Sequence, residues 1–354
     1  MDNPALTIGL AMALGMMSQV IARKFYLPGI VVLLAAGVIF GPDGLSWIQP
    51  SSLGPALQII VGFAVAVILF EGGMNLRISR IKREELAIRG LITIGALITL
   101  IGGTLAALLI LGWDFRTSIL FGTLIIVTGP TVITPLLKRV RLHHGVSTVL
   151  EAEGILLDAI GAIVAVVALE IALSPSGLSF IKGLFHIVSR LTIGTIMGIA
   201  GGGLLTLLFR IRKLIPDGLE NVFILSWVFA LFQLANTASP ESGIAAVTIA
   251  GMTIGNSKTY IQKELLEFKE QLTVLMIGML FILLAADVRI TDIQLLGLKG
   301  VLTVLFLMLV VRPLSVFAAT TNSDLDTRHK LLLSWIAPRG IVAAAVASLF
   351  AFEL

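Results

Sequence analysis

Long apolar stretches alternate with short polar connections along the whole chain. Each stretch has about 15 to 25 residues, the length that a helix needs to cross the hydrocarbon core of a bilayer. The stretches fall at approximately 4–22, 27–41, 53–74, 86–111, 117–137, 146–172, 190–209, 219–237, 241–255, 267–286, 294–319 and 331–351. This pattern predicts an all-α polytopic membrane protein with twelve helices in one transmembrane domain over 1–354. The segment 180–189 is expected to lie at the membrane surface.

Positive charge follows the same alternation. Cytoplasmic loops of membrane proteins carry an excess of Lys and Arg, and most of the 25 Lys and Arg residues fall in every second connection. These connections hold Arg23 and Lys24; Arg77, Arg80, Lys82, Arg83 and Arg89; Lys138, Arg139 and Arg141; Arg210, Arg212 and Lys213; Lys258, Lys263 and Lys269; and Arg328 and Lys330. We therefore expect basic loops in the cytoplasm, the amino terminus outside, and a location in a prokaryotic-type plasma membrane.

Two apolar stretches resemble each other across the chain. The segments 28–42 and 242–256 match at Gly29/Gly243, Ile30/Ile244, Ala36/Ala250, Gly37/Gly251 and Gly41/Gly255. They are the second and the ninth stretch, and an odd offset inserts the second copy upside down, as in the inverted repeats of secondary transporters. We expect repeats over approximately 4–172 and 219–354 with a linking helix at about 180–209. The same offset predicts a thirteenth helix after Leu354.

Each half also contains one interruption inside an apolar stretch. Thr128, Gly129, Pro130 and Thr131 interrupt the fifth stretch, and Pro338, Arg339 and Gly340 interrupt the twelfth. Proline removes a backbone hydrogen bond and clashes with the preceding turn, so either site can be a simple packing kink. A matched pair instead favours two broken helices, with Arg339 neutralising carbonyl ends at the second break.

The sixth stretch carries three acids, Glu151, Glu153 and Asp158. A carboxylate in mid-membrane costs several kcal/mol and by default marks a functional site. Five residues correspond to about 500° of helical rotation, so Glu153 and Asp158 point roughly 140° apart and are expected to have different roles. Arg312 lies inside another apolar stretch and needs a partner for the same reason of cost. Glu153 is the acid left over, and an ion pair fixing two helices is favoured over a transport role for it.

Composition limits the chemistry. Hydrophobic residues make up 57% of the 354 positions and charged residues 13%, against roughly 25% charged in soluble domains. The chain has no cysteine, which excludes disulfides and thiolate sites, and its four histidines form no metal-ligand pattern. We expect no cofactor, no nucleic-acid partner and no enzymatic activity; the partners are the lipid bilayer and the ions that the protein moves.

Seven segments in order carry a likeness to a known family. They are PGIVVLLAAGVIFGP at 28–42, LFEGGMNL at 69–76, TGPTVITPLLKRV at 128–140, EGILLDAIGA at 153–162, SGIAAVTIAG at 242–251, VVRPLSV at 310–316 and SWIAPRGIVAAAVA at 334–347. With these segments the chain resembles the sodium/proton exchangers of the monovalent cation:proton antiporter superfamily over essentially its whole length.

The resemblance implies an inverted-repeat antiporter fold with two crossing discontinuous helices, and a homodimer. It implies that Asp158 binds the metal cation, Na+ or K+, and the proton, that Thr128 and the neighbouring Gly129 belong to the ion site, and that Glu153 pairs with Arg312. The ion-binding helices would be approximately 86–172 and 294–354 with 53–74 and 267–286, and the dimerisation helices approximately 4–41 and 190–255. Similar chains often continue into a cytoplasmic regulatory domain.

Two positions depart from the family pattern. Leu157 stands where relatives have Asn or Asp before the key aspartate, and Gly129 stands where many have Asp. Leu157 can neither bind a cation nor titrate, so ion selectivity and coupling number do not carry over from the resemblance.

The function that these observations favour is exchange of Na+ or K+ for H+ by alternating access. Cation and proton would bind Asp158 in turn, one for one and without net charge movement. Alternatives are a potassium-efflux-type K+/H+ exchanger with a regulatory domain, and a sodium-coupled symporter of an organic anion, although few polar residues lie near the breaks to bind such a solute. A channel would need a continuous polar stripe, and an intramembrane enzyme a Ser/His or metal constellation; the sequence offers neither.

Overall fold

The structure is a computed structural model of the chain. It describes residues 3–129, 144–173, 179–211, 215–216, 219–257, 262–337, 340, 342–344, 346–347 and 350. These residues contain helices and connections but no strand. The all-α prediction is therefore confirmed for the described part of the chain.

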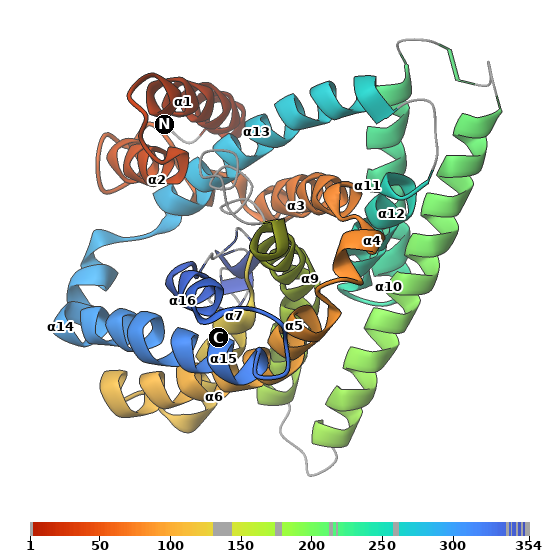
Figure 1. Cartoon of the computed structure of the whole chain (residues 1–354). Helices are drawn as coiled ribbons and strands as arrows, with labels where there is room; N and C mark the ends of the chain where they lie inside the picture. The colour runs from red at the N-terminus through yellow and green to blue at the C-terminus, as the bar shows by residue number, and fades with distance from the viewer. Residues whose placement is uncertain are drawn as a thin grey trace.

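The helices follow one another along the chain as shown in Figure 1. The first half contains α1 Pro4–Lys24, α2 Gly29–Phe40, the 3-10 helix η1 Pro50–Leu53, α3 Pro55–Asn75, α4 Ile78–Ile81, α5 Glu85–Gly90, the π-helix η2 Leu91–Gly95, α6 Ala96–Ala106, the π-helix η3 Ala107–Leu111, α7 Phe115–Ile126 and α9 His144–Leu173. The second half contains α10 Ser179–Arg210, α11 Glu220–Ala238, α12 Ser242–Gly255, α13 Gln262–Asp287, α14 Ile290–Phe306, the π-helix η4 Leu307–Val311, α15 Arg312–Ala319 and α16 Thr327–Trp335.

These helices coincide with the predicted apolar stretches in most places. Among the described residues, seven helices are long and apolar enough to cross a membrane: Pro4–Lys24, Pro55–Asn75, Glu85–Leu111, Gly145–Leu173, Lys182–Arg210, Glu220–Ala238 and Ile290–Ala319. Four shorter apolar helices cover Gly29–Phe40, Phe115–Ile126, Ser242–Gly255 and Gln271–Asp287. The segment 180–189 is continuous with the long helix α10, in agreement with the predicted helix at about 180–209; its place at the membrane surface stays a prediction.

Helix ends agree with local sequence chemistry. The Asn3 side chain accepts hydrogen bonds from the first backbone N–H groups of α1, and Asp114 and Asp326 do the same for α7 and α16. Such caps satisfy donors that have no partner inside the helix. Within α14, Gly297 has φ 47° and ψ −137° and breaks the helix, a conformation that favours glycine because other residues would place a Cβ against the backbone.

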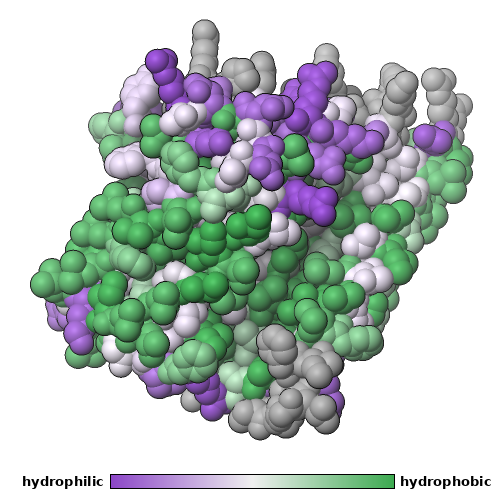
Figure 2. All heavy atoms as spheres, turned by 60° about the horizontal axis from the view of Figure 1, so that its bottom comes forward, coloured by the Kyte–Doolittle hydropathy of each residue, from purple (hydrophilic) through white to green (hydrophobic). Residues whose placement is uncertain are grey.

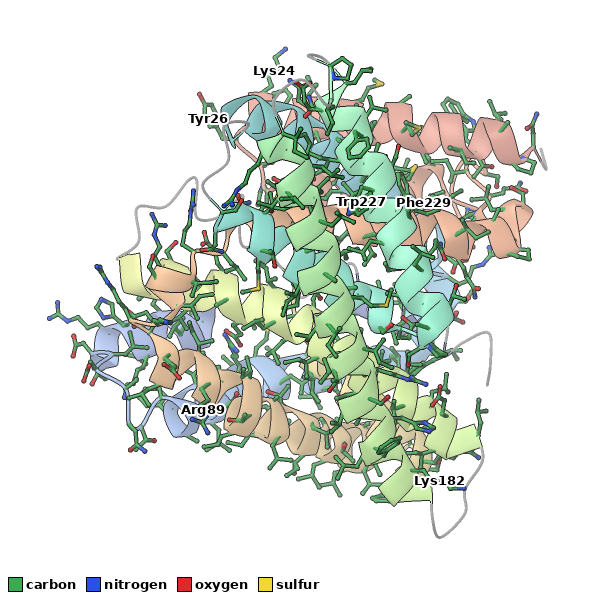
Figure 3. All side chains as sticks on the ribbon, turned by 90° about the vertical axis from the view of Figure 1, so that its right-hand side faces the viewer. Lys24, Tyr26, Arg89, Lys182, Trp227 and Phe229 are labelled. Carbon is green, nitrogen blue, oxygen red and sulfur yellow. The ribbon has the colours of Figure 1, made fainter. Side chains whose placement is uncertain are left out.

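The outer surface has the distribution expected of a membrane protein. Figure 2 shows a broad hydrophobic belt between two hydrophilic rims. Lys24, predicted in a cytoplasmic loop, and Lys182 lie at opposite ends of the molecule (Figure 3). Which end faces the cytoplasm stays a prediction.

Glycines allow close backbone contact between α3 and α12 and between α1 and α13. A Cβ on Gly251 of α12 would collide with the Phe70 carbonyl of α3, and a Cβ on Gly255 with the Met74 carbonyl, so α3 lies directly along α12. Gly15 of α1 meets α13, where a Cβ would lie 2.6 Å from the Gly278 carbonyl carbon. Thus α3 and α13, which the predicted domain division grouped with the ion-binding helices, pack mainly on α12, α1 and α2.

Helix α9 occupies the centre of the structure (Figure 1). It contacts α5, α7 and α16 on one side and α10 and α12 on another. The acidic residues of the sixth predicted stretch therefore lie on a helix that is packed between α5, α7 and α16 and the pair α10 and α12.

Candidate functional site

Asp158 lies in the middle of the molecule, on α9. It is only 1% exposed, and its Oδ1 atom has no hydrogen-bond partner within the part of the chain that the structure describes. An unpartnered buried carboxylate oxygen is costly, because its interactions with water are lost and not replaced. The predicted burial of Asp158 is confirmed.

Two interrupted segments meet at this carboxylate. Helix α7 ends at Ile126 and α16 ends at Trp335, and extended residues follow each. A Cβ added to Gly340 would lie 2.6 Å from the Gly129 Cα and 3.2 Å from Asp158 Oδ1, and one added to Gly129 would lie 3.3 Å from Asp158 Oδ2. The two chain segments therefore pass each other in direct backbone contact beside Asp158.

Three of the predicted break residues cannot be placed in this arrangement. Pro130, Pro338 and Arg339 lie outside the described residues, so the proposed roles of the prolines in breaking the helices and of Arg339 in neutralising carbonyl ends stay predictions. Helix α7 nevertheless ends four residues before Pro130, and α16 ends three residues before Pro338. Both helices thus end shortly before the predicted break.

The close approach of the two glycines leads to a prediction. Replacing Gly340 with Ala would force a methyl group against the Gly129 backbone, and we expect it to stop exchange activity and to cost about 1–3 kcal/mol of stability, as overpacking generally does. Gly203→Ala on α10 is the matched control, since nothing lies within 4 Å of its added Cβ. Thermal unfolding and transport assays compare the two; equal behaviour of both variants would contradict the tight crossing.

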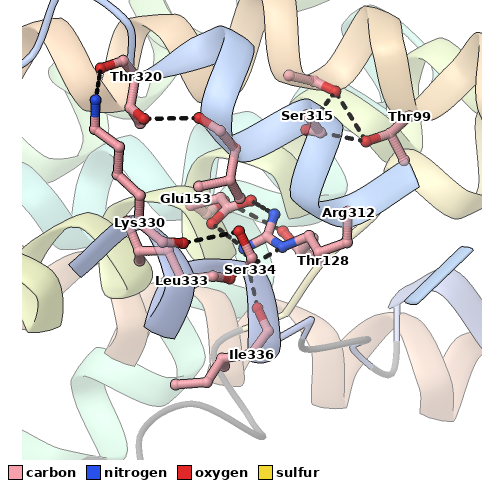
Figure 4. Close-up of polar contacts among 12 residues, drawn as sticks. Thr99, Thr128, Glu153, Arg312, Ser315, Thr320, Lys330, Leu333, Ser334 and Ile336 are labelled. Atoms are coloured by element: carbon pink, nitrogen blue, oxygen red, sulfur yellow. Dashed lines mark hydrogen bonds and ion pairs between the residues drawn. The ribbon is translucent and has the colours of Figure 1, made fainter. Parts of the chain in front are cut away.

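Glu153 forms the predicted pair with Arg312 (Figure 4). The Arg312 Nη2 atom donates to Glu153 Oε2 at 2.9 Å, and Nη1 forms a second short contact with Oε1. Glu153 is 1% and Arg312 6% exposed. Bidentate geometry of this kind matches the two carboxylate oxygens to the planar guanidinium, so the charges compensate each other away from water.

Arg312 also supports the end of α16. Its Nε atom donates to the Leu333 carbonyl at 3.3 Å and its Nη2 atom to the Ile336 carbonyl at 3.0 Å. Carbonyls in the last turn of a helix have no partner inside the helix. Arg312 therefore connects three elements: α9, α15 and the end of α16.

Thr128 occupies the extended segment after α7 and is 3% exposed. Its Oγ1 atom donates to the backbone carbonyl of Glu153 at 3.3 Å. This bond attaches the extended segment to α9 between the ion pair and Asp158. The role of Thr128 as a cation ligand is not tested by this contact.

A small polar cavity adjoins the ion pair, and sequence reasoning did not anticipate it. It is lined in part by Thr99, Thr128, Glu153, Leu157, Arg312 and Ser315. The hydroxyls of Thr99 and Ser315 both donate to the Gly95 carbonyl, at 2.8 and 3.0 Å. Gly95 ends the π-helix η2, where the changed turn frees backbone groups from the regular α-helical pattern.

Two of the π-helices lie in stretches that the predicted repeat would pair. Leu91–Gly95 lies in the fourth predicted stretch, which also contains Ala107–Leu111, and Leu307–Val311 lies in the eleventh. Single π-turns inside α-helices occur often at functional sites. Small polar residues such as Thr99 and Ser315 in otherwise apolar stretches were the available signal in the sequence.

Comparison with known proteins agrees with this geometry. The family model described as sodium/hydrogen exchanger, transmembrane, matches residues 9–353. Na(+)/H(+) antiporter 1 of Methanocaldococcus jannaschii is 28% identical over 98% of this chain and 83% of its own length. K(+)/H(+) antiporter NhaP2 of Shewanella oneidensis is 28% identical over 95% of this chain, which spans 58% of that relative.

A solved structure has the same fold. The sodium proton antiporter MjNhaP1 from Methanocaldococcus jannaschii superimposes with a TM-score of 0.85 at 25% identity, covering 98% of this chain and 85% of the solved one. The fold is thus that of a membrane-embedded secondary transporter. The chain belongs to the sodium/hydrogen exchanger family, as its seven sequence segments indicated.

Proposed function

We propose that this chain exchanges a monovalent cation for protons across a membrane by alternating access, with Asp158 as the shared carrier. The observation that carries the proposal is the position of Asp158. It is a buried carboxylate with an unpartnered oxygen, held where the Gly129 and Gly340 segments meet. Relatives named as Na+/H+ and K+/H+ antiporters support the same function.

The chemistry of exchange follows from one buried negative charge. An isolated carboxylate in a low-dielectric interior needs neutralisation, and either a proton or a monovalent cation provides it. The two ligands exclude each other, because each compensates the same charge. If the site opens to one side of the membrane at a time, each crossing carries either a cation or a proton, which is coupled exchange.

The ion pair supports a stoichiometry of one proton for one cation. Arg312 contacts both carboxylate oxygens of Glu153, so the guanidinium charge compensates the carboxylate charge. Within the proposed carrier site, Asp158 is then the only group whose charge is compensated by a different ligand during the transport cycle. The loaded site has the same net charge with either ligand, and transport moves no net charge.

The helix contacts support a division into moving parts that differs from the one based on resemblance. We place α5–α7, α9 and α14–α16 in the ion-carrying unit, and α1–α3 and α10–α13 in the unit against which it moves. In this grouping α3 and α13 join the second unit, because they pack along α12, α1 and α2. The main contacts that would change during transport are those of α9 with α10 and α12.

A liposome experiment tests the stoichiometry and the cation. Purified protein is reconstituted with an internal pH dye, Na+, K+ or Li+ is added outside, and the membrane potential is clamped at several values. We expect cation-driven proton movement whose rate does not depend on the potential. A voltage-dependent rate would reject one-for-one exchange, and no proton movement with any of the cations would reject the proposed function.

A further inference from the structure

Two chain connections join the two proposed units of helices, and they begin with related sequences. The first runs from the end of α3 to the start of α5, and the second runs from the end of α13 into α14. They read LRISRIK at 76–82 and VRITDIQ at 288–294, with matches at Arg77/Arg289, Ile78/Ile290 and Ile81/Ile293. The offset between them, 212 residues, is close to the 214 residues between the matching segments at 28–42 and 242–256. The two connections therefore correspond to each other in the predicted repeat.

In the second connection, Asp43 holds the first residues of α14. Asp43 follows α2, and its Oδ1 atom accepts a hydrogen bond from Arg289 Nη1 at 2.9 Å, while its Oδ2 atom accepts one from the Ile290 backbone N–H at 2.6 Å. These bonds hold the pKa of Asp43 below its ordinary value, the Ile290 bond more strongly than the Arg289 bond. One carboxylate thus fixes both the side chain before α14 and the first backbone donor of α14.

The first connection is held in a similar way, at the other end of α3. Arg77 Nη1 donates to the Gly255 carbonyl at 2.8 Å, and the Ile78 backbone N–H donates to Asn256 Oδ1 at 2.9 Å. Asn256 Nδ2 also donates to the Leu76 carbonyl at 2.8 Å. Here too, an Arg side chain and the backbone N–H that follows it are bound by one short segment of another helix end.

The recurrence of this arrangement distinguishes it from an accidental surface contact. Asp43 lies just beyond α2 and Asn256 just beyond α12, the two helices that the predicted repeat pairs. Arg77 and Arg289 each directly precede a helix, with φ −89° and ψ 116° in one case and φ −90° and ψ 133° in the other. Asp43 and Asn256, called the anchors below, both belong to the proposed unit that does not carry the ion.

A break in the helix follows each anchored start. Helix α4 ends at Ile81, residues 82–84 lie outside any helix, and α5 begins at Glu85. In α14 the break is Gly297, whose φ of 47° and ψ of −137° lie in a region that glycine alone commonly occupies. Helix α4 also packs on α9, whereas residues 287–299 are all exposed and α14 packs mainly on η3 and η4 of the ion-carrying unit. Asp43 therefore holds a segment with little packing of its own against the other unit.

We propose that Asp43 and Asn256 are positioning residues for the transport movement: each fixes the start of one connection to the unit that does not carry the ion, and the chain bends at the break that follows. The inference rests on the proposed alternating access. Movement between rigid units is absorbed by a few residues at the ends of elements, and Gly297 can change its backbone angles without a steric penalty. Without Asp43, the exposed segment 287–296 follows the moving unit, and the bending is no longer confined to Gly297.

The first test measures the maximal exchange rate and the cation concentration that gives half of it. Asp43→Ala removes both bonds, and we expect the maximal rate to fall about tenfold, the effect of losing one charge-assisted hydrogen bond. The half-saturating concentration should not change, because the carrier site at Asp158 is untouched. The unfolding temperature should stay close to that of wild type, since exposed ion pairs contribute little to stability.

Two further variants accompany Asp43→Ala. Asp43→Asn keeps an acceptor for the Ile290 N–H, so its rate should lie between those of wild type and Asp43→Ala. Asp292→Asn, which removes an exposed carboxylate from the first turn of α14, is the control and should behave as wild type. A wild-type maximal rate in Asp43→Ala, or a fall that is matched by loss of folded protein, would overturn the proposal.

The second test locates the bend with two glycines of the same conformation. Gly54, directly before α3 in the unit that does not carry the ion, has φ 49° and ψ −133°, and an added Cβ meets nothing within 4 Å at either Gly54 or Gly297. Gly54→Ala and Gly297→Ala thus introduce the same backbone strain and should lower the unfolding temperature equally. We expect only Gly297→Ala to slow exchange. Equal exchange rates in the two variants would reject Gly297 as the place where the chain bends.

Distances between spin labels test the anchor without transport. The chain has no cysteine, so labels can be attached to cysteines introduced at exposed positions. Leu45 lies beside Asp43, Ile293 lies in the anchored segment, and Leu309 lies beyond Gly297. We expect Leu45→Cys with Ile293→Cys to give one distance at every pH and cation concentration. Leu45→Cys with Leu309→Cys should give two distances whose proportions change with these conditions.

The outcomes separate the anchor from the proposed function. A distance between positions 45 and 293 that changes as much as the distance between 45 and 309 would reject Asp43 as an anchor, even if the protein exchanges cations for protons. The expected distances in a protein that shows no exchange would reject the proposed function and leave the anchor in place. In Asp43→Ala the single distance between 45 and 293 should be replaced by a broad distribution, and its persistence would overturn the proposal.

Discussion

Replacing Asp158 with Asn is expected to abolish cation-driven proton movement in liposomes. Asn has nearly the same shape but no charge, so it attracts no cation and exchanges no proton. The Asp158 carboxylate has an unpartnered oxygen, and the backbones of Gly129 and Gly340 lie close beside it. Once the charge is removed, few groups remain there to hold a cation. We expect the rate to fall by at least about a hundredfold, which corresponds to roughly 2.7 kcal/mol.

Glu151→Gln is the matched control for this variant. Glu151 lies on the same helix, and seven residues, close to two full turns, separate it from Asp158. The control removes one carboxylate from α9 without changing the carrier site, and we expect most of the activity to remain. Asp158→Asn should also unfold at the wild-type temperature or above it, because it removes a buried charge. Full proton movement in Asp158→Asn would reject Asp158 as the carrier.

The sequence was sufficient to predict most of the helices, because membrane helices are specified by the length and polarity of local segments. The stretches at 4–22 and 53–74 became α1 and α3 with nearly the predicted bounds. The segment 180–189 is continuous with α10, and its place at the membrane surface stays a prediction. His186 within it and Arg190 directly after it both contact Glu170 of α9.

The ion pair of the site could be predicted from the energetic cost of burying a charge in a membrane. The close backbone contacts of the site could not be predicted from local sequence. Glu153 and Arg312 could be paired from sequence because each is too costly to leave alone in a membrane. The sequence predicted breaks around Gly129 and Gly340, and the resemblance implied that the two broken helices cross, but neither indicated that the two glycine backbones touch. The π-turn that ends at Gly95 was not predicted either, although the hydroxyls of Thr99 and Ser315 that donate to its carbonyl stand out in apolar stretches.

Breaking the pair of Glu153 and Arg312 is expected to destabilise the protein strongly. Glu153→Gln leaves a buried guanidinium without its counter-charge, and Arg312→Gln leaves a buried carboxylate and two carbonyls, of Leu333 and Ile336, without donors. Removing one partner of a buried ion pair typically costs about 3–5 kcal/mol. We expect each variant to unfold at a clearly lower temperature, and Arg312→Gln to be the less stable because it loses more hydrogen bonds.

The exchanged pair, Glu153→Arg with Arg312→Glu, separates charge compensation from the other bonds. It restores opposite charges on α9 and α15, but glutamate cannot donate to the carbonyls after α16. Stability should therefore return only in part. If Glu153 is structural, Glu153→Gln protein that remains folded should still exchange cations for protons with a voltage-independent rate. A stable Glu153→Gln variant that shows no exchange, or whose exchange rate depends on voltage, would instead indicate that Glu153 is a second titrating carrier. The loss of a purely structural residue lowers stability but does not change the coupling between cation and proton.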